Sequence, residues 1–521
     1  MKKRLLCTIL ATVMTIGCLS GCGGSGGPSS GVSDGTGRSD TGGNDESEAD
    51  GETYNVVVQW PSLGDTPAGL EDVEAMINEI IEPEIGCTVT LQPGNAFSLA
   101  NETALAVSTG EKLDLCLSLF SGVGDLVNSG SIIELDSLYE EYGADIAEVL
   151  DMRIAGGYYG DKLYGLPNGY INGEKYGFVC RTDILDKYGI TIDENKVYTM
   201  DELDEIFKTI KAGEGDSFFC IGGTNSTTEL FQSFYPYDWL GQTSSSGVLM
   251  LNDGANETVI SNMYATEEYA EYAQKMYEWA QKGYFSADAA TNTEEGSAQV
   301  RAGNYFGWFP GTCSGGAADY NTQTGMDMTI ITTVNGFSAT NMFQAILWCI
   351  PITSERPEKA MQFMNYMFKN PEVANLLQFG IEDVDYVVVE ENEKDVLIDY
   401  PEGLDNTTIP YYQMFGVYGD RLKWPIRVPN SIDYNENLRT FNDSIKKFSP
   451  ALGYIFVVDE VSAQYSAVAA VVNQYQSLIS TGAADPAEQL PAFLNALEAA
   501  GMNEVIAENQ RQYDEWMAAQ K

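Results

Sequence analysis

The sequence of 521 residues contains no histidine. Mechanisms that need an imidazole base are therefore excluded, as are Ser-His and Cys-His pairs and histidine-rich zinc or haem sites. Basic residues are scarce as well, because 28 Lys and Arg stand against 76 Asp and Glu, for a formal net charge of −48. Nucleic-acid binding needs clustered cations, and so does electrostatic docking on an anionic membrane, so this charge argues against both.

Hydrophobic runs of membrane length are absent. Near the N-terminus, Lys2, Lys3 and Arg4 precede an apolar run over 5–16, which is typical of a secretory signal peptide and short for a membrane span. The run ends in Leu-Ser-Gly before Cys22, and this resembles the lipobox of bacterial lipoproteins. The resemblance implies removal of residues 1–21, a diacylglycerol on the thiol and anchoring to the outer face of the bacterial cytoplasmic membrane. An ordinary signal peptide is the alternative.

The segment that follows, 22–53, is rich in Gly, Ser, Asp and Glu, so we expect a disordered tether. Removal of the three cations of residues 1–21 takes the formal charge from −48 to −51, which favours a monomer. Hydrophobic residues make up 44% of the chain, which is enough for buried cores, and the length favours two or three domains.

The cysteines form no metal-binding or redox motif. Three of the nine lie in residues 1–22, and the other six are scattered without a Cys-x-x-Cys. Most of these six stand within apolar runs, which favours buried free thiols. Disulfide pairing is the alternative, because the environment outside the cell is oxidising. The six are Cys87, Cys116, Cys180, Cys220, Cys313 and Cys349.

Strand and helix patterns alternate from residue 54 onward. Residues 54–60 predict a strand, 69–82 a helix and 87–91 a second strand, and a helix over 96–110 precedes a strand over 112–119. This alternation predicts an α/β fold with parallel sheets, helices on both faces and ligands at the carboxyl ends of strands. Further expected elements are strands over 176–181 and 343–351, helices over 199–212, 267–283 and 357–369, and an almost entirely helical chain after Pro450.

Several short motifs follow one another along most of the mature chain. They are STGEKLD (108–114), YGLP (164–167), RTDILDKYG (181–189), PEKAM (357–361), SPALG (449–453) and ENQRQYDEW (508–516). In this order they resemble the family 1 extracellular solute-binding proteins of ABC transporters, in the subgroup with an additional C-terminal module.

This resemblance implies a two-lobed fold of the periplasmic-binding-protein type II, with ligand in a cleft that closes by hinge motion. Chain crossings are expected within 163–178 and 335–348. The implied parts are lobe 1 at 54–168, lobe 2 at 169–334, a return to lobe 1 at 335–400 and a helical, mostly lobe 2 segment at 401–521. The family's solute is typically a carbohydrate, often an oligosaccharide, and its partner is a two-subunit ABC permease. Neither catalysis nor a cofactor is implied.

A neutral sugar presents apolar C–H faces and a rim of hydroxyls, which proteins meet with aromatic rings and planar polar groups. The chain has 30 Tyr, 21 Phe and 7 Trp, so placement decides which of them are relevant. Packing in a core is the alternative for each aromatic candidate, and we expect three or more to line the cleft; Trp279 and Trp516 are expected to pack. The candidate ligand contacts, near strand ends, turns and crossings, are Trp60, Tyr170, Trp239, Trp308, Asn341, Trp348, Arg421 and Trp424.

Other ligand and function classes stay open. Arg421 lies in the densest basic cluster, 420–427, where a bidentate contact with a uronate, sulfate or phosphate competes with local ion pairing, which we favour. A peptide or acidic glycan as ligand, a surface glycan-tethering protein without transport, and a histidine-free glycosidase with two carboxylates are further alternatives. A calcium site at 252–257 lacks the full loop spacing.

Overall fold

The computed structural model describes residues 53–63, 66–119, 122–223, 230–241, 243–251 and 258–520. The predicted signal peptide, Cys22 and all but the last residue of the predicted tether lie outside the described residues, as does the calcium alternative at 252–257. Within the described part, no helix combines the length and apolar character needed to cross a membrane. No group of acidic or thiol side chains in that part is arranged to hold a metal ion.

The predicted βαβ opening is confirmed. Strands β1 (Tyr54–Ser62) and β2 (Cys87–Asn95) pair in parallel, and helix α1 (Leu70–Ile85) connects them. Val73, Ile77 and Ile81 recur at helical spacing and are fully buried. The helix ends at Gly86, whose φ of 61° suits a residue without a side chain.

A first hydrophobic core combines parts of the chain that lie far apart in sequence. Its three-stranded sheet has the order β3-β13-β6, with β3 (Cys116–Leu119), β13 (Ile346–Cys349) and β6 (Leu166–Pro167). The core also holds Tyr411 and Tyr418. Other elements of this region are α2 (Leu99–Thr109), α3 (Gly124–Asn128), α4 (Asp136–Tyr142), α5 (Ala144–Leu150), α11 (Pro357–Lys369), α12 (Pro371–Phe379), β14 (Val387–Glu391), β15 (Val396–Asp399) and β16 (Ile426–Arg427).

A five-stranded sheet supports the second core, in the order β17-β12-β7-β11-β8. Its strands are β7 (Glu174–Arg181), β8 (Phe219–Gly222), β11 (Tyr305–Trp308), β12 (Met328–Ser338) and β17 (Lys447–Phe448). The prediction of parallel sheets is wrong for this sheet and for the sheet of the first core. Strand β7 runs antiparallel to both β11 and β12, and β13 runs antiparallel to both β3 and β6. Strand β7 brings the chain into this sheet and β12 takes it out again toward β13, so the two neighbours point in opposite directions.

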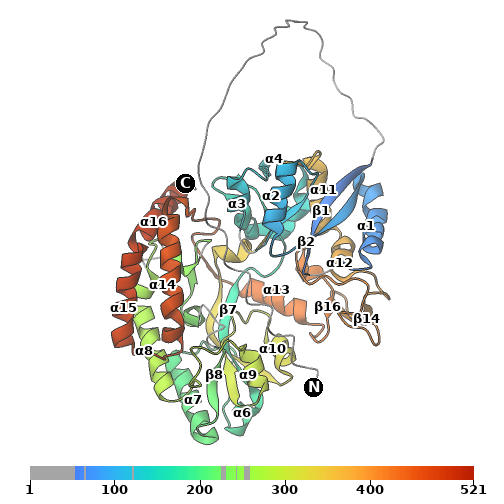
Figure 1. Ribbon diagram of the computed structural model, residues 1–521. Coiled ribbons are helices and arrows are strands. Elements are labelled where there is room, and N and C mark those ends of the chain that lie inside the picture. The colour runs from blue at the N-terminus through green and yellow to red at the C-terminus, as the bar shows by residue number, and fades with distance from the viewer. Residues whose placement is uncertain are drawn as a thin grey trace, which may run out of the picture. The chain divides into compact units, whose positions relative to one another are not determined.

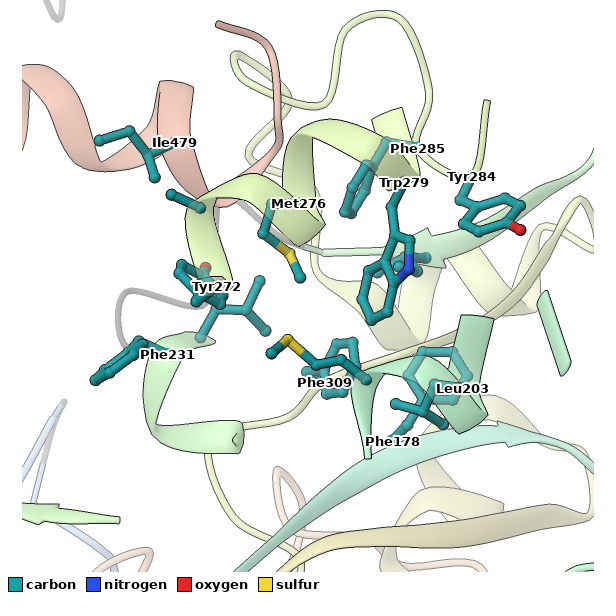
Figure 2. Close-up of a cluster of buried hydrophobic side chains, with 14 of the residues drawn as sticks. Phe178, Leu203, Phe231, Tyr272, Met276, Trp279, Tyr284, Phe285, Phe309 and Ile479 are labelled. Atoms are coloured by element: carbon teal, nitrogen blue, oxygen red, sulfur yellow. The ribbon is translucent and has the colours of Figure 1, made fainter. Parts of the chain in front are cut away.

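Aromatic side chains fill the second core. Helix α7 (Met200–Glu214) begins at the capping box of Thr199 and Glu202, and it contributes Leu203. Trp279 of helix α8 (Glu267–Gln281) is fully buried and packs among Phe178, Phe309 and their neighbours in Figure 2, so its expected packing role is confirmed. Shorter helices nearby are α6 (Thr182–Lys187), α9 (Gly296–Arg301) and α10 (Ala317–Thr324).

Helices dominate the chain from Ser462 onward, as predicted, whereas the helical prediction is wrong for 401–433, where the structure has turns, irregular backbone and β16 but no α-helix. Helices α14 (Ser462–Ser480), α15 (Pro486–Ala500) and α16 (Met502–Ala519) lie side by side, in red in Figure 1. Val468 and Phe493 join the second core, and Trp516 stacks on Tyr513 with ring centroids 5.9 Å apart, as expected of a packing residue. Residues 450–461 form an irregular segment before α14, ending in a 3-10 turn over Asp459–Val461.

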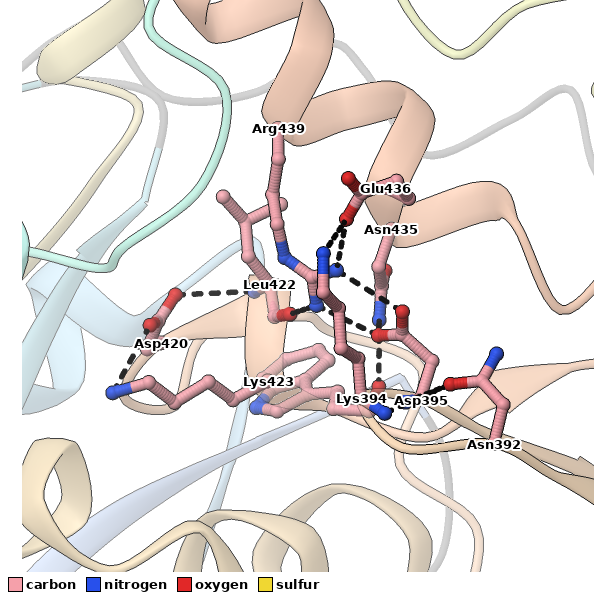
Figure 3. Close-up of polar contacts among 10 residues, drawn as sticks. Asn392, Lys394, Asp395, Asp420, Leu422, Lys423, Asn435, Glu436 and Arg439 are labelled. Carbon is pink, nitrogen blue, oxygen red and sulfur yellow. Dashed lines mark hydrogen bonds and ion pairs between the residues drawn. The ribbon is translucent and has the colours of Figure 1, made fainter.

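Polar contacts connect the segments between the two cores. Arg153 is buried, and its Nε donates to the carbonyl of Asn168 at 2.9 Å, while Nη1 donates to that of Ile171. Arg439 of α13 (Tyr434–Ser444) donates to both carboxylate oxygens of Asp395, at 2.7 and 3.0 Å (Figure 3). The division into lobes at 168/169, 334/335 and 400/401 stays a prediction. The six cysteines are free and buried, as favoured.

Candidate functional site

A cavity of about 540 Å³, here called the first cavity, is lined by five separate segments. Its volume lies in the range of small-molecule sites. The lining residues are Gly122, Gly124, Asp125 and Asn128; Tyr159; Trp239, Gly241 and Thr243; Asn341, Gln344 and Ala345; and residues 455–459. The segments are the five-residue helix α3, a short hairpin, a 3-10 turn and irregular chain, which is usual where a rigid scaffold presents short connecting elements to a ligand.

The segment after β3 and a short hairpin form one side of the first cavity. Asn128 is at the end of α3, and Tyr159 ends strand β4 (Tyr158–Tyr159), which pairs with β5 (Lys162–Leu163). The phenol of Tyr159 donates to Asn128 Oδ1 at 3.0 Å. This bond holds a ring and an amide together at the rim of the cavity.

Asp238 connects the Trp239 segment to the Asn341 segment. Its carboxylate is fully buried; Oδ1 accepts from the backbone N–H of Leu240 at 2.8 Å, and Oδ2 accepts from the N–H and hydroxyl of Thr340 at 3.0 and 2.8 Å. Trp239 and Asn341 are the chain neighbours of these bonded residues. Asp238 therefore positions two of the predicted ligand contacts without lining the cavity itself.

Three side-chain atoms at the first cavity are buried and have no hydrogen-bond partner among the described residues. They are Nε1 of Trp239, Oδ1 of Asn341 and Nε2 of Gln344. A buried polar group left unpaired costs about 1–3 kcal/mol. Two donors and one acceptor on the wall of one cavity are complementary to hydroxyl groups, because each hydroxyl both donates and accepts.

The lining of the first cavity is negatively charged. Asp125 and Asp459 are exposed there, and no Lys or Arg occurs among the described residues that line it. Burial raises the pKa of the Tyr159 phenol, and these two carboxylates raise it further against the opposing effect of Asn128. Tyr159 is therefore a neutral donor at physiological pH, and the lining disfavours an anionic ligand.

A second cavity, of about 380 Å³, is lined by the end of β1 and by residues of the 406–415 segment. Trp60 lines it but is 2% exposed, and its Nε1 donates to the Tyr411 hydroxyl at 2.9 Å. The Tyr411 hydroxyl in turn donates to the carbonyl of Leu377 at 2.5 Å. The exposed side chains of Leu63 and Met414 make its rim apolar.

Tyr170 and Arg421 contact each other and line neither of these cavities. The guanidinium carbon of Arg421 lies 3.6 Å from the centroid of the Tyr170 ring and 5.4 Å from that of Trp424. The nearby ion pair is between Lys423 and Asp420, at 3.6 Å. Within the described part, no carboxylate pairs with Arg421, so cation–π stacking takes the place of the local ion pairing that we favoured.

The remaining three candidates lie in hydrophobic cores. Trp348 is fully buried and donates from Nε1 to the carbonyl of Val417 at 2.8 Å. Trp308 packs edge-on against Tyr320 at 5.6 Å, and Trp424 packs edge-on against Phe379 at 5.8 Å. These positions agree with the packing alternative. Trp424 Nε1 is, like Trp239 Nε1, buried without a hydrogen-bond partner among the described residues, but it lines neither cavity.

Of the eight predicted residues, the structure brings Trp239 and Asn341 together at the first cavity, and Trp60 lies at the second. Nothing in the sequence pattern marks Gln344 or residues 455–459 as parts of a site, and Asp238 was missed as well. A carboxylate inside the aromatic segment 234–239 is a weak signal for Asp238. The 455–459 segment has no local signal, because its place at the cavity depends on the packing of the C-terminal helices.

Two family models match the chain. One is described as a bacterial extracellular solute-binding protein and matches residues 75–381, and the other, a domain of unknown function (DUF3502), matches 450–518. The chain is 26% identical to a protein of Streptococcus pneumoniae serotype 4 named carbohydrate ABC transporter substrate-binding protein. This match covers 92% of the chain and 94% of that protein.

The structure is similar to the crystal structure of the N-glycan transport solute binding protein NgtS from Streptococcus pneumoniae. The TM-score is 0.74 at 25% identity, over 90% of this chain and 100% of that one. The same protein in complex with Man5GlcNAc gives a TM-score of 0.61 at 25% identity, over 90% and 99%. The predicted family and the two-lobed α/β fold are thereby confirmed.

Proposed function

Because the chain belongs to the bacterial extracellular solute-binding proteins, we propose that it captures a neutral oligosaccharide and delivers it to an ABC importer. The observation that carries this proposal is the group of three unpaired polar atoms on Trp239, Asn341 and Gln344 at one cavity. An indole whose N–H is one of two donors, beside one amide acceptor, matches a sugar, whose C–H faces stack on rings and whose hydroxyls pair with such atoms.

The relatives support a carbohydrate over a peptide. One relative is named for carbohydrate transport, and one of the similar crystal structures is a complex with Man5GlcNAc. The charge of the lining supports a neutral glycan over an acidic one, because Asp125 and Asp459 repel carboxylates and sulfates. Trp60 at the second cavity is the proposed contact for further sugar units of a longer ligand.

Binding is proposed to act on a conformational equilibrium. Residues 122–159 precede the first crossing of the chain, and residues 239–243 and 455–459 follow it, so a ligand in the first cavity contacts both sides. Such a ligand favours the conformation in which the two sides are closest. The permease subunits then recognise that closed form, and the bound sugar passes on chemically unchanged.

A titration with defined glycans tests the ligand class. Protein starting at Gly23 is titrated with Man5GlcNAc, other neutral oligosaccharides, uronate oligosaccharides and peptides by isothermal calorimetry. We expect a neutral oligosaccharide to bind and Asn341→Ala to weaken it at least tenfold, because the amide oxygen is lost. Phe97→Ala, an exposed ring that lines neither cavity, is the control and should bind normally. Binding of peptides alone, or of uronates alone, contradicts the proposal.

The same samples test for catalysis. Chromatography of the oligosaccharide after prolonged incubation should show no shorter product. Release of sugar units, lost in Asp125→Asn or Asp459→Asn, would instead support the glycosidase alternative.

The lipid anchor and the location at the cell surface are proposed from the Cys22 lipobox. Cys22→Ala in cells that carry the full-length gene should move the protein from the membrane fraction to the soluble fraction. A protein that stays in the membrane fraction after this change contradicts lipid anchoring at Cys22.

A further inference from the structure

The irregular segment at the start of the C-terminal module lies on the wall of the first cavity. Residues 450–518 match the domain of unknown function, and of these only 455–459 line the cavity among the described residues. The helices that follow, α14 to α16, lie behind this segment and contact the second core or each other. The module therefore reaches the ligand site through five consecutive residues.

Helix α16 holds this segment by a pair of hydrogen bonds from one side chain. The backbone N–H of Val457 donates to Gln512 Oε1 at 3.0 Å, and Gln512 Nε2 donates to the carbonyl of Val457 at 2.9 Å. The amide of Gln512 thus pairs with both polar groups of one residue in the middle of the segment. The segment has no helix or strand to supply these partners, and half-buried backbone groups need them.

A second contact from the same helix fixes the start of the segment. The Tyr454 hydroxyl lies 2.8 Å from Asn509 Oδ1, and Asn509 Nδ2 donates to the carbonyl of Ser246 at 2.8 Å. Asn509 is fully buried, and residues 509 and 512 lie on one face of the helix because they are three positions apart. Burial of a side-chain amide is unfavourable unless the amide is hydrogen-bonded. The amides of Asn509 and Gln512 both form hydrogen bonds with residues outside the helix.

We infer that the C-terminal module builds one wall of the ligand cavity and that Gln512 is a positioning residue for ligand binding. It holds residues 455–459 in the bound arrangement before ligand arrives, so α16 sets the affinity without contacting the ligand. This inference rests on the proposed function. The energetic reason is that a segment ordered beforehand does not lose conformational entropy on binding.

Gln510 provides a matched control on the same helix. The backbone N–H of Ile260 donates to Gln510 Oε1 at 2.8 Å, and Gln510 Nε2 donates to the carbonyl of Thr258 at 3.2 Å. Both glutamines are half-buried and pair with backbone groups, but 258–260 lines neither cavity. Each amide also donates within the helix at 2.8 Å, Gln512 Nε2 to Glu508 and Gln510 Nε2 to Asp514. Methionine in either position keeps the length of the side chain and removes the two bonds to the backbone together with this one.

Hydrogen exchange without any ligand first tests whether Gln512 holds residues 455–459 in place. Gln512→Met should speed exchange of peptides that cover 454–461, and Gln510→Met should speed exchange around 258–263 and leave 454–461 protected. Unchanged exchange at 454–461 in Gln512→Met overturns the inference at this stage.

Calorimetry with Man5GlcNAc, or with the neutral oligosaccharide that binds best, then tests the consequence. We expect Gln512→Met to bind at least tenfold more weakly, with the loss in the entropy of binding, and Gln510→Met to stay within twofold of the unmodified protein. Melting temperatures of both variants are measured alongside, so that a general loss of stability is recognised by equal effects.

The outcomes separate the two proposals. If the unmodified protein binds and Gln512→Met binds equally well, or if both variants lose affinity equally, the inference is wrong and the proposed function stands. If the unmodified protein binds no neutral oligosaccharide, the proposed function fails, and the inference fails with it.

Discussion

An indole lines each of the two cavities, but only one of the two indole N–H groups has a hydrogen-bond acceptor among the described residues. At the second cavity Trp60 Nε1 donates to Tyr411, and the neighbouring Gln413 amide donates to the carbonyl of Pro61 at 3.2 Å. At the first cavity Trp239 Nε1 and two amide atoms have no partner among the described residues. Both volumes lie in the range of small-molecule sites and both linings are aromatic, so the clear difference is in the unpaired polar atoms. An unpaired buried group is tolerated where a ligand or water completes it.

The largest expected effects come from two buried aspartates, one beside each cavity. Asp238 holds the neighbours of Trp239 and Asn341, and Asp385 accepts from the N–H groups of Tyr411 and Ile381, both at 2.8 Å. Replacement of either by Ala should lower the free energy of unfolding by about 3 kcal/mol, because buried N–H groups lose their acceptor. Asp238→Ala should also abolish glycan binding, and Asp385→Ala should not. Chemical denaturation and calorimetry measure these effects, and equal loss of binding would break the comparison.

Removal of the indole N–H is expected to affect ligand affinity at the first cavity and folding stability at the second. Trp239→Phe should weaken glycan binding about tenfold, or about 1.4 kcal/mol, and leave the free energy of unfolding nearly unchanged. Trp60→Phe should lower the free energy of unfolding by about 1–3 kcal/mol, because Tyr411 loses its donor, and leave the affinity for a short glycan intact. Denaturation and calorimetry on both variants are decisive, and a loss of affinity confined to Trp60→Phe would exchange the roles of the two cavities.

The ion pair of Asp395 and Arg439, at 2.7 Å, makes stability pH-dependent. Burial raises the pKa of Asp395, but the hydrogen bonds and charge of Arg439 outweigh it, and the net shift is downward. The ionised form therefore favours folding above the ordinary carboxyl pKa of about 3.9, and this contribution is lost as the pH falls below it. Asp395→Asn should lower the unfolding free energy at pH 7 by about 1–2 kcal/mol and flatten its acid dependence. Denaturation curves between pH 3 and 7 check this, and unchanged curves would show that the bond is unimportant.

The smallest effects are expected from the exposed carboxylates of the first cavity. Asp459→Asn should change the affinity for a neutral glycan by less than about threefold, because an exposed charge is screened by solvent. The same change should improve binding of a uronate oligosaccharide at low ionic strength and less so at high ionic strength. Calorimetry at two salt concentrations measures both, and a large loss with the neutral glycan would make Asp459 a direct contact.

Much of the secondary structure is predictable because its signals are local. The helix expected over 357–369 has those bounds in the structure, with Pro357 in its first turn and apolar residues at helical spacing. The capping box at Thr199 starts α7 where the sequence places it. The relative direction of the strands was harder to predict from the sequence, because β7 pairs with β12 only after about 150 residues of intervening chain.

The candidate site was predictable only in part. Trp239 and Asn341 follow from aromatic and amide residues near expected turns and crossings, but the same criteria select Trp308 and Trp348, which lie in cores. Gln344 is marked by a buried donor without a partner among the described residues, and this depends on its surroundings in the folded chain.

The sequence by itself determined the acidic, histidine-free composition, the order of most helices and strands, and the family. It did not determine which indole would be open to a ligand. Trp60 is paired by Tyr411, 351 positions away, and the first cavity is completed by residues 455–459, which a side chain from the last helix holds in place. Helix and strand formation depends on neighbours within a few positions, whereas hydrogen-bond satisfaction depends on groups that only the folded chain brings together.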